Sequence, residues 1–129
     1  MEIATFLEDL KSYLVNNGIE NIYRDFMPDE PAEAIGLFLW SHSVPSINDG
    51  SGTRYIQVQV RSNDGDTAYK TACEIVPLLD SGEDEKVIFL TESRWCIARP
   101  RTLPCKMRES VDGTVVYYCE FALFGANIP

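Results

Sequence analysis

The strictest pattern in the chain is an alternation of apolar and polar residues over positions 54–61. The apolar positions are Ile56, Val58 and Val60, and the polar positions are Gln57, Gln59 and Arg61. Because successive residues of a strand point to opposite faces, the pattern predicts a half-buried strand. Its apolar face needs a covering layer, so we expect a sheet with at least one side packed against other elements.

A helix is predicted directly after this strand. Residues 62–66 read SNDGD, and aspartate and asparagine are favoured at helix N-caps. A helical stripe of apolar residues follows and consists of Ala68, Ala72, Ile75, Val76 and Leu79. Pro77 lies inside that stripe, cannot donate a backbone hydrogen bond to Cys73 and disfavours helical backbone at Val76. We therefore expect the helix to kink or break there.

The other elements follow from similar local signals. An amphipathic helix is expected over residues 3–16, and Gly18 suits its C-terminal stop. Further strands are expected at 19–26, 35–41, 86–93, 94–109 and 114–125, with loops at 27–34, 42–53 and 80–85. We expect one α+β domain over residues 1–129, with a mostly antiparallel sheet of four to five strands and two main helices packed on it.

The final two strands are expected to pair with each other. Asp112 and Gly113 are a good hairpin signal between segments 94–109 and 114–125. The first of these segments contains Pro100 and Pro104, and proline cannot donate a hydrogen bond to a neighbouring strand. This segment is therefore predicted to be irregular or to lie at a sheet edge.

The charge balance limits the kinds of partner. The formal net charge is −9, which argues against general nucleic-acid binding because such binding neutralises phosphates with Lys and Arg. Every apolar window of membrane-spanning length is broken by charges or prolines, and the N-terminal MEIATFLEDL lacks the basic region of a signal peptide. We therefore expect no membrane segment and no tight binding of nucleic acid.

No catalytic, cofactor or metal site is predicted. Ser41, His42 and Ser43 are neighbours in sequence, and strand neighbours point to opposite faces, which is poor geometry for a nucleophile and its base. Asp64 and Asp66 are not followed by the later ligands of a calcium loop and are better explained as capping residues. The four cysteines form no CxxC motif, so we expect free thiols in a reducing compartment and no zinc site.

Three motifs occur in order along residues 3–126. They are the strand Gln57-Val58-Gln59-Val60-Arg61, the pair Ala68-Tyr69 in the helix after it, and Arg99, Pro100 and Leu103 at the start of the final hairpin. This order resembles the minor capsid or tail-terminator proteins of tailed phages with long non-contractile tails. The resemblance implies a structural, non-enzymatic protein that forms a hexameric ring at the head-proximal end of the tail. Such a protein stops growth of the tail tube and takes part in head–tail joining.

The same resemblance implies partners and a location. The partners are other copies of the chain, the tail-tube protein, and the head connector or a head-completion protein, with no cofactor. The expected location is the virion, and the host cytoplasm during assembly. A connector-side head-completion protein is one alternative. A small-molecule or peptide-binding module that uses loop 42–53 and an open sheet edge is another, and an enzyme with a non-standard site is the third.

Charged and polar residues provide candidates for contacts between copies. Residues 94–108 contain five basic residues and no acid, residues 25–33 contain four acids and no base, and residues 80–85 contain four more acids. A ring needs heterologous contacts, and complementary charge can set their register. The candidate interface residues are Gln57, Gln59, Arg61, Arg99 and Arg101. The alternatives are that the charges only keep the protein soluble, and that the polar row is a hydrated sheet face.

Overall fold

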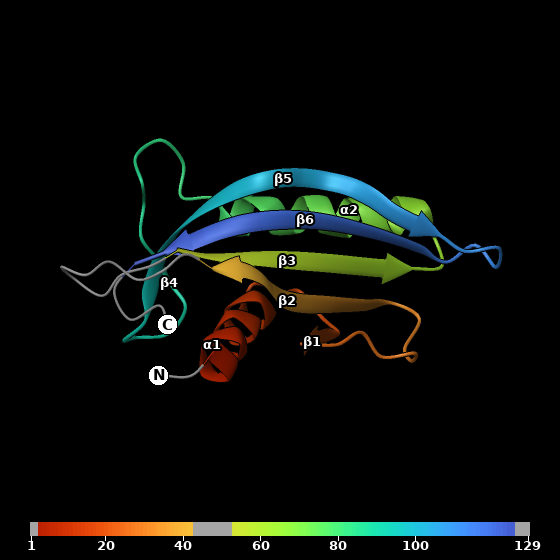
Figure 1. Cartoon of the computed structure of the whole chain (residues 1–129), viewed down its shortest axis with the longest axis horizontal. Coiled ribbons are helices and arrows are strands. Elements are labelled where there is room, and N and C mark those ends of the chain that lie inside the picture. Colours follow the sequence, from red (N-terminus) through yellow and green to blue (C-terminus); the bar gives the residue numbers. More distant parts are fainter. Residues whose placement is uncertain (1–2, 43–52, 126–129) are drawn as a thin grey trace.

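The computed structural model describes residues 3–42 and 53–125, and within these ranges it contains one mixed sheet and two α-helices (Figure 1). The strands are β1 (Ile22–Arg24), β2 (Ala34–His42), β3 (Thr53–Ser62), β4 (Ile88–Phe89), β5 (Trp95–Glu109) and β6 (Val115–Phe124). The helices are α1 (Ile3–Asn16) and α2 (Gly65–Ile75), and α2 continues into a short 3₁₀ helix, η1 (Val76–Leu79). The strand order across the sheet is β1-β2-β3-β6-β5-β4.

Helix α1 has the bounds that the sequence predicts, and its end shows why. Gly18 adopts a φ of +91°, its N–H donates to the Val15 carbonyl at 3.0 Å, and the Ile19 N–H donates to the Leu14 carbonyl at 3.1 Å. This pair of bonds satisfies carbonyl groups that the helix leaves free, in the manner of a Schellman motif. The positive φ explains the glycine at this position.

Strand β3 and helix α2 confirm the predictions for the central segment. The even-numbered residues of β3 are buried and the odd-numbered residues are only partly buried. Asp64 is the N-cap of α2, since its Oδ1 accepts from the Asp66 N–H at 3.1 Å and its Oδ2 accepts from the Thr67 hydroxyl at 2.9 Å. The helix ends at Ile75, and Pro77 lies in η1, so the predicted break is present.

Both helices cover the same face of the sheet. One continuous cluster joins the apolar stripe of α1 with the buried side chains of α2 and the inward side chains of the strands. Its members include Phe6, Leu7, Leu10 and Leu14 from α1, Ala68, Ala72 and Ile75 from α2, and Ile56, Val58, Cys119 and Phe121 from the sheet. Neither α1 nor α2, the two α-helices of the described residues, packs on the opposite face, which is called the outer face below (Figure 1).

The α+β class is confirmed, but the sheet differs from the prediction of four to five mostly antiparallel strands. Six strands are present in the described residues, and β1 runs parallel to β2, with Ile22 opposite Ile35. Strand β1 has only three residues, which is too short to show a reliable alternation. The parallel pairing of β1 with β2 therefore depends on tertiary packing and could not be predicted from the local sequence.

The strand predicted over 86–93 is mostly wrong. Only Ile88–Phe89 pairs with β5, because the chain then turns sharply. The N–H groups of Leu90 and Thr91 both donate to the Arg94 carbonyl, at 2.9 and 3.2 Å, and this closes the turn. Beyond its first two residues β5 is an edge strand with several register shifts, as its prolines predict.

All four cysteines are free, as predicted, and two of them lie in the core. Burial raises the pKa of the Cys96 and Cys119 thiols from 9.0 to about 12. The unfolded chain releases these protons at a lower pH than the folded protein. The stability that the two neutral thiols contribute is therefore complete below pH 9 and is lost as the pH rises from 9 towards 12.

We expect the free energy of unfolding in urea to fall steadily with pH above 9, the ordinary pKa of these thiols. The control is the double variant Cys96→Ala with Cys119→Ala, which lacks both buried thiols. Its stability should fall less steeply with pH than that of the natural chain. Equal slopes for the two proteins would show that the buried thiols do not contribute.

Candidate functional site

The outer face carries a connected row of polar side chains in its centre. Gln59 Nε2 donates to Gln57 Oε1 at 2.8 Å, and Gln57 Nε2 donates to Glu120 Oε2 at 3.4 Å. From the other side, the Thr102 hydroxyl donates to Glu120 Oε1 at 2.7 Å. These four residues, called the polar array below, span β3, β6 and β5. Both glutamines lie on the face predicted for them, and their role as subunit contacts stays a prediction.

Sequence reasoning missed Glu120 and Thr102. A signal was present for Glu120, because it is an isolated acid within the aromatic strand YYCEFALF. The residue that it faces depends on strand register, and Gln57 lies 63 positions earlier in the chain. Thr102 lies at a register shift of β5, so neither its face nor its partner follows from alternation.

Arg101 lies on the outer face beside the polar array. Its guanidinium carbon lies 4.5 Å from the centroid of the Tyr55 ring, which is a cation–π distance. This pair, called the Arg101–Tyr55 stack below, brings together β5 and β3 across β6. The stack holds a positively charged plane at the protein surface. Tyr55 is a further residue of the face that sequence analysis did not select.

Arg61 has a different role from its neighbours on β3. Its guanidinium donates to the backbone carbonyls of Pro28, Asp29, Pro31 and Ala32, and its bonds to Pro31 and Ala32 are 2.7 and 2.9 Å long. All four carbonyls belong to residues 25–33, called the acidic loop below. Arg61 therefore fixes the backbone of this loop against the end of β3. Its predicted role as a direct contact between copies is not tested by this geometry.

The basic stretch 94–108 does not form one surface. Arg94 is buried, and its Nη1 lies 3.3 Å from Asp9 Oδ2 of α1. Arg99 forms an ion pair with Glu85, so part of the acidic stretch 80–85 already has a partner in its own chain. Of the two arginines selected from this stretch, only Arg101 has no carboxylate partner among the described residues.

Two hollows lie near the acidic loop. One, of about 200 Å³, is bordered by the start of β2, the end of β3 and one side of α2, and its lining includes Glu20, Glu33 and Glu74. The other, of about 360 Å³, separates the acidic loop from the β5–β6 hairpin, and its lining is mostly charged and polar. Small-molecule sites are mainly apolar with a few polar groups, so this composition does not favour a ligand-binding module.

Neither a candidate metal site nor a membrane-spanning helix is found among the described residues. Within 3–42 and 53–125, no group of three His, Cys, Asp or Glu side chains is placed to hold a metal ion. None of the helices in these ranges is long and apolar enough to cross a membrane. The side chains of Ser41, His42 and Ser43, and loop residues 43–52, lie outside the part of the structure that is described.

A family model described as bacteriophage tail terminator protein matches residues 6–122 of the chain. The match includes most of α1, all of α2 and the residues of the polar array and the Arg101–Tyr55 stack. No curated protein matches the chain.

Proposed function

Because this chain belongs to the bacteriophage tail terminator family, whose members are structural proteins of the virion, we propose that it caps the tail tube at its head-proximal end. The observation that carries this proposal is the family match over residues 6–122. A cap of this kind prevents further tube subunits from adding. It also presents a surface to which the head binds, so the protein takes part in head–tail joining.

The proposed cap is a hexameric ring of this chain. Its partners are the tail-tube protein on one side and the head connector or a head-completion protein on the other, and the ring assembles in the host cytoplasm. A ring requires two different contact surfaces on each copy, because each copy binds one neighbour on either side. The outer face supports this assignment, since among the described residues both α-helices pack on the other side of the sheet and leave this side to a partner.

The composition of the outer face also supports a role in protein contacts. It combines Tyr55, Tyr118 and Arg101 with the amides and hydroxyl of the polar array. Tyrosine and arginine are enriched in protein interfaces, and amide groups supply the hydrogen bonds that such interfaces contain. This combination of tyrosine, arginine and amide groups therefore favours a protein contact over a sheet face that only contacts water.

Deletion of the gene should give phage lysates in which tails are overlong and carry no heads, as seen by electron microscopy. Uncapped tubes continue to add subunits, and the head lacks its binding surface. Supplying the natural chain from a plasmid should restore tails of normal length with heads attached, which controls for effects on neighbouring genes.

Two other outcomes of the deletion would change the assignment. Tails of normal length that fail to join heads would favour the connector-side head-completion protein. Complete, infectious particles in the deletion lysate would contradict both roles.

A further inference from the structure

We propose that the Arg101–Tyr55 stack of one copy binds the acidic loop of the next copy, and that this is a head-to-tail contact between neighbouring subunits. The inference rests on the proposed function for the expectation that copies of the chain meet. The choice of these two surfaces comes from the charges that remain unpaired in the structure and from where they lie.

Arg101 is available to a partner, whereas the arginines around it are not. Arg99 pairs with Glu85, and Arg94 is buried against Asp9. Among the described residues, Arg101 contacts the Tyr55 ring and forms no ion pair. The stack leaves the edges of the guanidinium free to donate hydrogen bonds. Because the ring already holds the guanidinium in place, less side-chain entropy is lost when a carboxylate binds.

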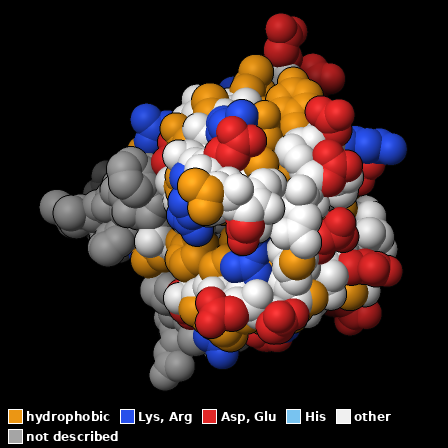
Figure 2. Space-filling view, turned by 90° about the vertical axis from the view of Figure 1, so that its right-hand side faces the viewer, with side chains coloured by type: hydrophobic (Ala, Val, Ile, Leu, Met, Phe, Trp, Pro, Cys, Tyr) orange, Lys and Arg blue, Asp and Glu red, His pale blue; other side chains and the backbone are white. Residues whose placement is uncertain are grey.

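The acidic loop provides fitting carboxylates on a fixed backbone. Asp29 and Glu30 are exposed, and within the described residues neither side chain has a cationic partner. The bonds from Arg61 to four carbonyls of the loop keep this backbone in one position. Figure 2 faces the end of the molecule where the loop lies and shows Asp and Glu side chains spread over this end, with Lys and Arg side chains among them. The acidic loop is therefore opposite in charge to the Arg101–Tyr55 stack, and the backbone of the loop, like the guanidinium of the stack, is already held in place before the two surfaces meet.

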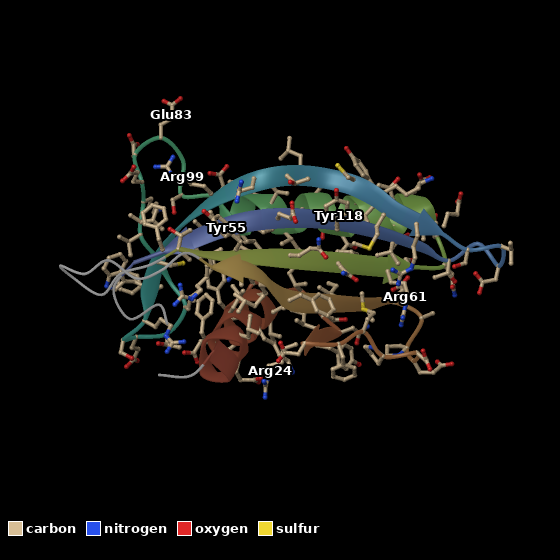
Figure 3. All side chains as sticks on the ribbon, viewed as in Figure 1. Arg24, Tyr55, Arg61, Glu83, Arg99 and Tyr118 are labelled. Carbon is tan, nitrogen blue, oxygen red and sulfur yellow. The ribbon has the colours of Figure 1, made fainter. Side chains whose placement is uncertain are left out.

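The two surfaces cannot meet within one copy. Tyr55 and Arg61 lie near opposite ends of β3 (Figure 3), and six strand residues span about 20 Å. Two complementary patches at opposite ends of a subunit produce a heterologous contact, in which one copy's stack meets the next copy's loop. Such contacts repeat around a closed ring, whereas a twofold dimer would place the same patch against itself.

The test compares Arg101→Glu with the matched control Arg99→Glu. Both variants reverse one exposed charge on β5, but the Arg99 side chain already has its partner within the same chain. Sedimentation velocity of the full chain over a range of concentrations should show self-association at least about tenfold weaker for Arg101→Glu than for Arg99→Glu. The difference should shrink at high salt, because the contact involves exposed charges. Circular dichroism melts check that both variants fold.

A rescue variant makes the pairing specific. Adding Asp29→Lys and Glu30→Lys to Arg101→Glu restores opposite charges on the two surfaces, so this triple variant should recover self-association. The double variant Asp29→Lys with Glu30→Lys, which keeps Arg101, should self-associate more weakly than the natural chain. The same variants are also expressed in the deletion phage, and normal-length tails with heads are counted, so that a chain that is monomeric alone is still tested. Equal association and equal tail counts for Arg101→Glu and the natural chain would overturn the contact. The proposed function would survive that result, because the deletion phenotype tests it separately.

Discussion

Replacing Asp9 with alanine should destabilise the folded protein by about 2–3 kcal/mol, because it removes the one carboxylate that pairs with Arg94 among the described residues. The Arg94 side chain is only 3% exposed, and Asp9 is 25% exposed. The guanidinium also lies 5.7 Å from the centroid of the Phe6 ring, so it is enclosed by an apolar group. The expected loss of stability is smaller than that for breaking a fully buried ion pair, because the Asp9 side chain is partly exposed to water.

The neighbouring residue on α1 provides a matched control for this experiment. Glu8 pairs with Arg24 at 2.8 Å, but both side chains are well exposed. Glu8→Ala should therefore change the free energy of unfolding in urea by no more than about 0.5 kcal/mol. The double variant Asp9→Ala with Arg94→Met should recover part of the loss, since no charge is then buried alone. Equal losses for Asp9→Ala and Glu8→Ala would contradict the buried ion pair.

Replacing Arg61 with alanine should cost about 2–3 kcal/mol of stability and release the acidic loop. The substitution removes the donor to four backbone carbonyls, and hydrogen bonds from a charged group are the stronger kind. Released backbone is a preferred site of proteolysis, so limited digestion should produce new cleavage within residues 25–33. Urea unfolding and mass spectrometry of the digest measure the two effects.

Gln59→Ala is the control for Arg61→Ala on the same face of β3. Among the described residues the Gln59 side chain donates only to Gln57, so its loss should change stability by no more than about 0.5 kcal/mol and leave the loop protected. If the polar array contacts a neighbouring copy, Gln59→Ala should still reduce the number of capped tails. A loop that resists digestion equally in Arg61→Ala and the natural chain would show that Arg61 does not hold it.

The strand faces of the candidate residues on β3 could be predicted because alternation assigns faces reliably, whereas their role as a site stays a prediction. Gln57 and Gln59 lie where their positions in the strand place them, and their links to Glu120 depend on register. Arg61 shares the alternation, but its guanidinium turns to the loop, since loop carbonyls lie within its reach. The charge runs were poorer guides, because charge order along the chain does not indicate which side chain is buried, as Arg94 is, or already paired, as Arg99 is.

Local interactions explain what could be predicted from the sequence of this protein. The bounds of α1, the Asp64 cap, the break at Pro77 and the inward face of β3 all depend on residues within a few positions of one another. The parallel β1–β2 pair, the buried Arg94–Asp9 pair and the Arg101–Tyr55 stack join residues far apart in the chain. Such contacts form only when strands and helices that are distant in the sequence pack together. No single segment therefore determines them, and they could not be predicted from local sequence.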